Sequence, residues 1–229
     1  IYENIEPAVF IDRPNRFIAN IEIGGRPEIC HVKNTGRCRE LLLPGAKVLV
    51  QRKESPNRKT GYDLISVSKG DRLVNIDSAA PNKVFAEWVR AGGLFGNLTL
   101  LRPEARFGNS RFDFYLEADG RRVFAEVKGV TLEENGVVRF PDAPTERGVK
   151  HLRELVSCVK AGYDAWAVFI VQMKDVSYFE PNWETHPAFG EALLAAERAG
   201  VNLLALDCRV TEIGIAAADP VPILTDPPR

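Results

Sequence analysis

The sequence has few of the residues that bind zinc or form stabilising disulfides. It contains three histidines and four cysteines among 229 residues, and no two cysteines stand in a Cys-x-x-Cys pair. A zinc site is therefore not expected, and a disulfide-rich secreted scaffold is not expected at this length. The longest apolar run falls short of the ~18 residues that a membrane span needs, and no basic-then-apolar leader opens the chain. These absences predict a protein of the reducing cytoplasm with no membrane partner.

Neither sign of charge is in large excess overall, but the basic residues are concentrated near the N-terminus. The formal net charge is -1. Between residues 26 and 69, however, ten lysines and arginines outnumber four acidic residues, and the rest of the chain is acidic. A basic patch of this kind suits a partner that carries phosphates, although a well-solvated surface would give the same pattern.

The first 80 residues predict several short strands separated by turns. Apolar and polar residues alternate in short segments, with glycine, proline, asparagine and serine between them. This spacing is typical of a small antiparallel barrel or sandwich. About five strands in ~70 residues fit a barrel of the oligonucleotide/oligosaccharide-binding (OB) type. The expected strands are 17–23, 28–32, 47–51, 62–66 and 73–77.

Pro81-Asn82 interrupts that pattern, and residues 81–229 alternate strands with helices. Such alternation predicts an α/β domain, so the whole chain is expected to be a mixed α/β protein with an OB-like barrel in residues 1–80. Asn82 is expected to cap a helix that ends at Gly92-Gly93. The apolar run 165–172 predicts a strand covered on both faces. Further helices are expected over 142–161 and 187–199, and further strands over 98–101, 112–117, 123–128 and 201–207.

The segment RFDFYLEADGRRVFAEVKGV, residues 111–130, predicts a hairpin that gathers charges at one end. Asp119-Gly120 is a typical hairpin turn, and a turn centred there places Asp113 opposite Glu126. Side chains opposed in this way have Cβ atoms ~4.5–5.5 Å apart, so the two carboxylates would repel unless a cation lay between them. Phe112 and Phe114 are expected to face the core together, because they are two residues apart.

A divalent cation, Mg²⁺ or Mn²⁺, would relieve this repulsion. Mg²⁺ takes one or two carboxylates and keeps several waters, and such an ion acidifies a bound water and stabilises the charge that builds on a phosphodiester. Lys128 shares a strand face with Glu126 and would neutralise the same charge. The predicted metal ligands are Glu104, Asp113 and Glu126, and the predicted catalytic residues are Asp113, Glu126 and Lys128. A solvated ion-pair face is the alternative explanation.

Cationic residues lie in the first two turns of the second expected helix, for which either Asp142 or Thr145 is the expected cap. Arg147, Lys150 and His151 lie on one helical face, where their charge opposes the helix dipole. A phosphate bound at this N-terminus would interact favourably with both the helix dipole and the cations. We therefore predict that Arg147 and Lys150 bind nucleic acid and that His151 contacts a phosphate or Glu154. The alternative is a set of i,i+4 ion pairs on a solvent-exposed face.

Three stretches of the chain resemble the sugar fermentation stimulation protein A (SfsA) family. They are NRFIANIEIGG…HVKNTGRCRELLLPG, SRFDFYLE…FAEVKGVTLEENGVVRFPDAPTERGVKHLREL and AGVNLLALDCRV. The resemblance covers nearly the whole chain. It implies an N-terminal barrel of the OB type, a C-terminal domain of the PD-(D/E)XK nuclease fold, DNA binding, and a regulatory link to bacterial sugar metabolism.

The PD-(D/E)XK pattern matches Asp113, Glu126 and Lys128, and Glu104 fits its upstream acidic position. Phe112 stands where the proline of the motif would be, which is a departure from the pattern.

In the barrel, the segment KNTGRCREL places three cationic residues around one loop. Lys33, Arg37 and Arg39 are predicted to bind the nucleic-acid backbone, although Arg37 and Arg39 would also suit a barrel edge or an interdomain seam. Aromatic residues are sparse in the barrel, so base stacking has little support.

Together these patterns predict a DNA-binding protein with a divalent-metal-dependent nuclease site and weak sequence preference. The main alternative is a transcriptional regulator that binds DNA through a nuclease-like fold without cutting it. A weaker alternative is a protein that binds RNA or a sugar. The patterns make no prediction of the oligomeric state.

Overall fold

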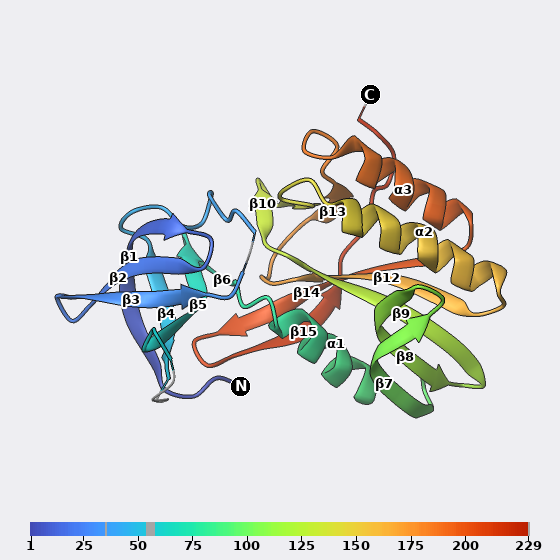
Figure 1. The fold of residues 1–229 in the computed structure, drawn as a ribbon, viewed down its shortest axis with the longest axis horizontal. Helices are drawn as coiled ribbons and strands as arrows, with labels where there is room; N and C mark the ends of the chain where they lie inside the picture. Colours follow the sequence, from blue (N-terminus) through green and yellow to red (C-terminus); the bar gives the residue numbers. More distant parts are fainter. Residues whose placement is uncertain (35, 54–57, 229) are drawn as a thin grey trace.

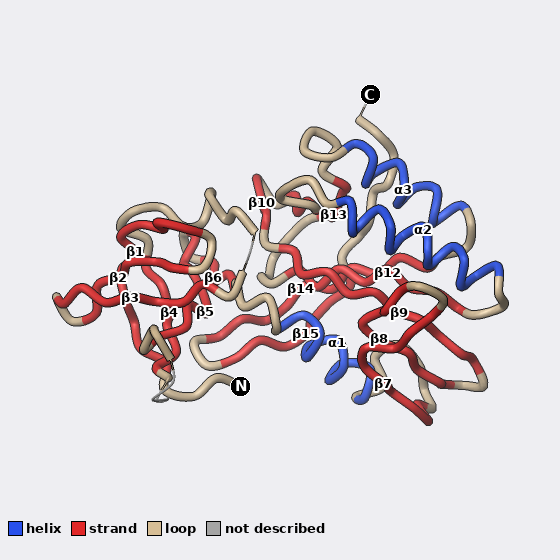
Figure 2. Tube along the Cα trace, viewed as in Figure 1, coloured by secondary structure: helices blue, strands red, loops and turns tan. Residues whose placement is uncertain are grey.

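The computed structural model describes residues 1–34, 36–53 and 58–228, which form an N-terminal barrel joined to a larger α/β domain (Figure 1). Figure 2 shows that the helices of these residues lie in the α/β domain, whereas strands occur in both parts. The mixed α/β fold expected from the sequence is thus confirmed. Among the described residues, no helix combines the length and the apolar character that crossing a bilayer requires.

Five strands form the barrel, which closes because β3 pairs with β5 as well as with β2. The closing contact is parallel and places Cys30–Val32 beside Tyr62–Leu64. Phe10, Ile21 and Val50 are at most 2% exposed and fill the interior, as expected of an OB barrel. The strands are β1 (Ile5–Asn15), β2 (Ile18–Ile23), β3 (Arg26–Val32), β4 (Lys47–Arg52) and β5 (Tyr62–Lys69), and β6 (Arg72–Asn75) pairs with β5.

The first strand of the barrel was not among the expected segments. Pro7 and Pro14 interrupt β1 and two register irregularities break its pairing with β2. Prolines within a segment argue against a strand when only the sequence is considered. All five expected segments coincide with β2 to β6, within a few residues at their ends.

The α/β domain is a six-stranded sheet with helices on both faces. Its order is β15-β14-β12-β9-β8-β7, in which β9, β12 and β14 run parallel. Helices α2 and α3 pack together over one face and α1 covers the other (Figure 1). The elements of this sheet are β7 (Leu98–Phe107), β8 (Ser110–Ala118), β9 (Arg121–Val130), β12 (Asp164–Val171), β14 (Asn202–Thr211) and β15 (Gly214–Pro220).

The remaining elements are three helices and a smaller sheet. The helices are α1 (Ala80–Arg90), α2 (Glu146–Lys160) and α3 (Pro187–Arg198), and the sheet contains β10 (Leu132–Glu134), β11 (Val137–Phe140) and β13 (Tyr178–Pro181). The expected buried strand is confirmed as β12, because Phe169 faces the apolar cluster under α2 and Ile170 the cluster under α1. This alternation explains why β12 has no polar face.

The predicted cap of the first helix is wrong, whereas one of the two caps considered for the second helix is confirmed. The cap of α1 is Ala79, and Asn82 lies inside the first turn with its side chain directed to Asp113. For α2 the cap is Thr145, which accepts a hydrogen bond from Gly148 N (3.1 Å), so the helix begins at Glu146. The other candidate, Asp142, instead accepts a hydrogen bond from Arg37 N of the barrel.

Gln172 ties the end of β12 to the segment that links the barrel to α1. Its buried Nε2 donates to Asn75 O (3.0 Å), Asn75 Oδ1 (2.9 Å) and Asp77 O (3.2 Å). The backbone of Gly129 lies so close to the side chains of Gln172 and Pro81 that a Cβ on residue 129 would collide with Gln172 Oε1 and with the ring of Pro81. Only glycine therefore fits after Lys128.

Two further contacts fix the barrel to the α/β domain. The Asp142 carboxylate accepts a hydrogen bond from the backbone N of Arg37 (2.7 Å). The Glu133 carboxylate lies 2.6 Å from Lys69 Nζ and 3.1 Å from Arg72 Nη1. The barrel is thus held on the side of β10 and on the side of the segment before α2.

Candidate active site

The hairpin of β8 and β9 has the register expected from its turn. Phe114 pairs with Ala125 and Leu116 with Val123. The last pair of the regular ladder is Phe114 with Ala125, so Asp113 and Glu126 lie just beyond it. There the Asp113 carboxylate accepts a hydrogen bond from Val127 N (2.8 Å). Asp113 therefore lies at the end of the hairpin that also carries Glu126.

The strand changes face at Asp113. Phe112 packs against Phe124 (ring centroids 5.6 Å apart), as does Tyr115 (5.1 Å), whereas Phe114 belongs to the cluster on the other face. The expectation that Phe112 and Phe114 share a face is therefore wrong, because the strand alternation breaks between them. A local break of this kind re-aims a side chain, here that of Asp113.

Two hydrogen-bond donors orient the carboxylate of Asp113, but its surroundings destabilise the ionised form. Asn82 Nδ2 donates to Oδ1 (3.0 Å) and Val127 N to Oδ2 (2.8 Å). Burial, and then the negative charge of Glu126, nevertheless raise the pKa of Asp113. The ionised carboxylate is thus oriented but lacks a counter-charge sufficient to offset its burial.

Glu126 is 4% exposed, and its two oxygens have different surroundings. Oε1 accepts hydrogen bonds from Lys128 Nζ and from His151 Nδ1. Burial would raise the pKa of Glu126, but these two hydrogen bonds outweigh it, so the pKa is lowered. Oε2 is buried and has no hydrogen-bond partner among the described residues. An ionised carboxylate with one unsatisfied buried oxygen is the kind of donor that a hard divalent cation binds.

His151 orients Glu126, a role that the sequence did not indicate. Arg147 Nε donates to His151 Nε2 (3.4 Å), so we assign the ring proton to Nδ1, which donates to Glu126. The expected contact of His151 with Glu154 is wrong, since the Glu154 carboxylate accepts from Ser110 Oγ and lies 3.7 Å from Lys150 Nζ. The one signal in the sequence was the shared helical face of residues 147 and 151.

Glu104 is placed apart from the other acidic residues. Its side chain is 70% exposed and lies 3.4 Å from Arg111 Nη1. Its backbone has a φ of +53°, a value that residues other than glycine rarely adopt. Within the described ranges, no group of three or more histidine, cysteine or acidic side chains is arranged to hold a metal ion. The structure therefore brings together Asp113, Glu126 and Lys128 but leaves Glu104 with Arg111.

Arg13 fixes the barrel loop that carries the cations proposed for DNA. Its guanidinium donates to the carbonyls of Arg16 (2.7 Å), Asn34 (2.7 Å), Gly36 (2.9 Å) and Arg37 (2.9 Å). Because this guanidinium is committed to carbonyl oxygens, it shapes the loop rather than offering a free charge.

The five cations predicted to bind nucleic acid lie in different surroundings. Lys33 Nζ is 2.5 Å from the Asp77 carboxylate. Arg37, Arg39 and Arg147 have exposed side chains, as does Lys150 beside Glu154. The bond from Arg37 N to the Asp142 carboxylate brings the barrel loop next to the segment that leads into α2. Exposed arginines of the barrel and of α2 therefore lie in one region of the molecule.

Comparisons with known proteins agree with these features. A family model described as the SfsA N-terminal OB domain matches residues 11–76, and one described as the sugar fermentation stimulation protein RE domain matches residues 79–214. The chain is 62% identical over 218 residues to a sugar fermentation stimulation protein homolog of Desulfitobacterium hafniense Y51, with 95% of each chain covered. It is 57% identical over 223 residues to a homolog of Clostridium beijerinckii, with 97% of this chain and 99% of the relative covered.

A solved structure extends the comparison to the whole fold. The structure of Pyrococcus furiosus SfsA in complex with Ca²⁺ matches with a TM-score of 0.89 and 29% identity, over 97% of this chain and 96% of that chain. The sequence relatives and the family models cover both the barrel and the α/β domain. The chain therefore belongs to the sugar fermentation stimulation protein (SfsA) family.

Proposed function

We propose that the protein binds DNA and hydrolyses its phosphodiester bonds with the help of Mg²⁺ or Mn²⁺, acting in the cytoplasm. The observation that carries this proposal is the buried Oε2 of Glu126, which has no hydrogen-bond partner in the described part of the chain and lies near the negative charge of Asp113. A buried carboxylate and a half-buried one that repel each other form a costly arrangement. A cation bound by both would remove that cost.

The residues present fit such an ion. Asp113 and Glu126 supply carboxylate oxygens, the backbone carbonyl of Val127 is a candidate third ligand, and waters would complete the shell, as Mg²⁺ prefers. The structure of the Pyrococcus furiosus relative is described in complex with Ca²⁺, a hard cation that also takes oxygen ligands. When bound, the ion would acidify a water and stabilise charge on the phosphate.

The protein's own residues supply orientation and positive charge. His151 and Lys128 hold Glu126 by Oε1 and leave Oε2 free. Asn82 and Val127 N hold Asp113. Lys128 also places an ammonium beside the two carboxylates, where negative charge would develop on the phosphodiester during hydrolysis.

The test is incubation of the purified full chain with plasmid and linear DNA in Mg²⁺, Mn²⁺ or EDTA. We expect metal-dependent products that disappear in Asp113→Asn and in Glu126→Gln. Glu117→Gln is the matched control, because Glu117 lies on the same strand as Asp113 but bonds Tyr115 OH (2.6 Å), and it should cut DNA as the unsubstituted protein does.

One result would replace this proposal with the regulator alternative. If DNA remained intact with every metal while binding persisted in EDTA, the fold would serve binding alone. Crystals soaked in Mn²⁺ give an independent measurement, because the proposal requires density for the ion between Asp113 and Glu126.

A further inference from the structure

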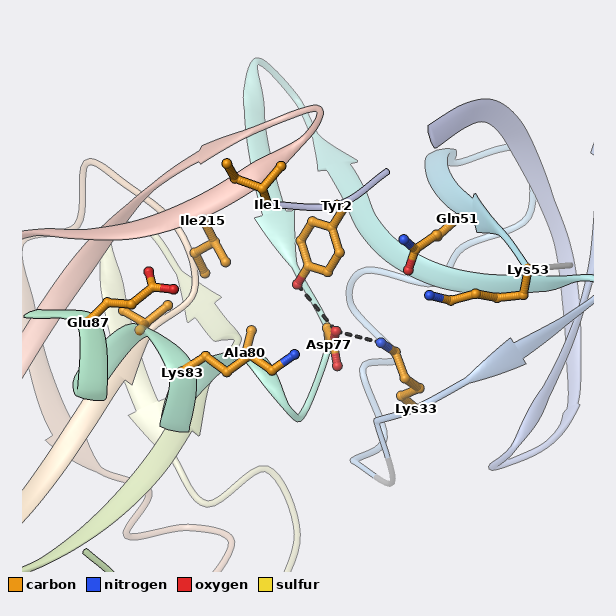
Figure 3. Close-up of a pocket in the computed structure, with 11 residues that line it drawn as sticks. Ile1, Tyr2, Lys33, Gln51, Lys53, Asp77, Ala80, Lys83, Glu87 and Ile215 are labelled. Carbon is orange, nitrogen blue, oxygen red and sulfur yellow. Dashed lines mark hydrogen bonds and ion pairs between the residues drawn. The ribbon is translucent and has the colours of Figure 1, made fainter. Parts of the chain in front are cut away.

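A cavity of about 190 Å³ lies where the barrel meets the α/β domain (Figure 3). It is lined from the barrel by Lys33 and Lys53, from the linker by Asp77, and from α1 by Ala80 and Lys83. None of the candidate catalytic residues is among its lining residues. The cavity is therefore a feature separate from the candidate active site.

Three lysines from three different segments direct their amines into this cavity. In Figure 3 Lys33 and Lys53 extend from the barrel side and Lys83 from α1, all toward Asp77. Asp77 is 3% exposed and is already satisfied, because it pairs with Lys33 (2.5 Å) and accepts a hydrogen bond from Tyr2 OH (3.3 Å). The charge of Asp77 is thus neutralised by the first lysine.

The other two lysines are not neutralised. In the part of the chain that the structure describes, Lys53 and Lys83 have neither an ion pair nor a hydrogen bond through their amines. Glu87 also lines the cavity, but Figure 3 shows its carboxylate on the side away from the lysines. Two unpaired ammonium groups beside a polar cavity are a binding site for an anion.

The backbone contributes in the same direction. Ala80, the first residue of α1, lines the cavity, and Lys83 lies in the first turn of this 11-residue helix. A helix N-terminus carries a partial positive charge that favours an anion. Because Ala80 N donates to Asp77 O and Pro81 has no N–H, this contribution comes from the helix dipole rather than from hydrogen bonds of these two residues. The volume also exceeds the ~30 Å³ of one water, which leaves room for a hydrated phosphate group.

We propose that this cavity binds a phosphate of the DNA backbone that lies outside the bond being cut. The inference rests on the proposed function, since it assigns a path to the same DNA. Asn82 supports Asp113 in the candidate active site and the next residue, Lys83, lines the cavity. The first turn of α1 therefore stands between the two sites, where a strand held by the barrel would pass on its way to the metal.

The surroundings favour a backbone phosphate over a free nucleotide. Among the described lining residues, Tyr2 is the one aromatic, and its hydroxyl is committed to Asp77 and Asn75. Recognition of a base normally uses an aromatic platform or several hydrogen bonds to the base edge. The cavity instead recognises charge, which every phosphate of a nucleic acid carries.

The test compares a double variant, Lys53→Gln with Lys83→Gln, with a control that removes two exposed cations elsewhere, Lys160→Gln with Arg198→Gln. Binding of labelled duplex DNA is measured in EDTA by fluorescence anisotropy over a range of salt concentrations. Loss of one phosphate contact should reduce the slope of log K against log salt by about 0.9. We expect this reduction in the cavity variant and the original slope in the control, with both variants unfolding thermally as the unsubstituted protein does.

Two results would overturn the inference. The first is an unchanged slope in the cavity variant, or an equal reduction in the control. The second is saturable binding of inorganic phosphate or adenosine monophosphate that the cavity variant loses while its DNA slope is unchanged, which would identify a free phosphate compound as the ligand. Because these measurements are made without metal, they are independent of cleavage, so metal-dependent cutting by the same cavity variant would leave the nuclease proposal standing.

Discussion

Replacing Glu133 with glutamine tests how firmly the barrel is fixed to the α/β domain. The Glu133 side chain is 6% exposed, and Oε1 accepts a hydrogen bond from Gly136 N (2.6 Å), while Oε2 faces Lys69 and Arg72. Glutamine keeps the size of the side chain and an oxygen for Gly136. It removes the negative charge, so Lys69 and Arg72 lose this ion pair and keep their bonds to the carbonyls of Glu133 and Asp175.

The expected cost follows from the burial of the three groups. Removing one partner of a fully buried pair costs about 3–5 kcal/mol, whereas an exposed pair contributes about 0–1 kcal/mol. Glu133 is buried, but the side chains of Lys69 and Arg72 are 30% and 25% exposed, so solvent screens part of the interaction. We therefore expect Glu133→Gln to lower the free energy of unfolding by about 2 kcal/mol at neutral pH.

The same contact should depend on pH. Burial alone would raise the pKa of Glu133, but the hydrogen bonds from Lys69 and Gly136 N outweigh it and lower the pKa. A carboxyl group with a pKa lower in the folded than in the unfolded state stabilises the fold above the unfolded value, about 4.3. That stabilisation is lost as the pH falls through the folded value, so the difference between the two proteins should shrink in acid.

Urea unfolding followed by circular dichroism at neutral pH and near pH 3 measures both effects. The control is Glu134→Gln, which changes the neighbouring residue, 75% exposed and 3.5 Å from Arg139, and should cost less than about 0.5 kcal/mol. Equal losses in the two variants would refute the role of burial. A loss in Glu133→Gln that stayed constant between the two pH values would refute the role of its charge.

Three further predictions concern the site, the barrel loop and the thiols. His151→Ala should weaken Mn²⁺ binding about 10–100-fold, as loss of a group that orients a metal ligand does, and calorimetric titration equal to that of the unsubstituted protein would show that Glu126 needs no such support. Arg37→Ala should reduce the salt slope of DNA binding by about 0.9, and an unchanged slope would remove that side chain from the interface. All four cysteines are free and buried, and burial raises the pKa of Cys38, Cys158 and Cys208 to about 12 and that of Cys30 further. They should therefore react slowly with a thiol reagent in the folded protein and rapidly in denaturant, and a fast-reacting thiol in the folded protein would contradict this packing.

Patterns that act over a few residues predicted much of the fold. Asp119-Gly120 set the register of β8 and β9 correctly, because a two-residue turn leaves one way to pair the strands. The apolar run of β12 indicated burial on both faces, which the sheet between α1 and α2 requires. The acids at positions 113 and 126 were consequently expected at the same end of one hairpin.

Contacts between distant segments were not predictable in the same way. Asn82 suits a helix cap as well as it suits a hydrogen bond to Asp113, and its sequence neighbours do not distinguish the two. The link between His151 and Glu126 depends on how α2 packs over β9, which no local pattern specifies. Glu104 has an unusual backbone conformation and pairs with Arg111 on the surface, whereas its place in the motif suggested a metal ligand.

The three hydrogen bonds from Gln172 also bear on how this protein could be re-engineered. They join Asn75, at the end of β6, and Asp77 of the linker to the residue that follows β12, almost a hundred residues further along the chain. A barrel joined to a different α/β domain would lack these hydrogen bonds, and the acceptors on Asn75 and Asp77 would need new donors. Chimaeras of this family should therefore fold best when barrel and module come from the same parent, even though each is recognised as a separate unit.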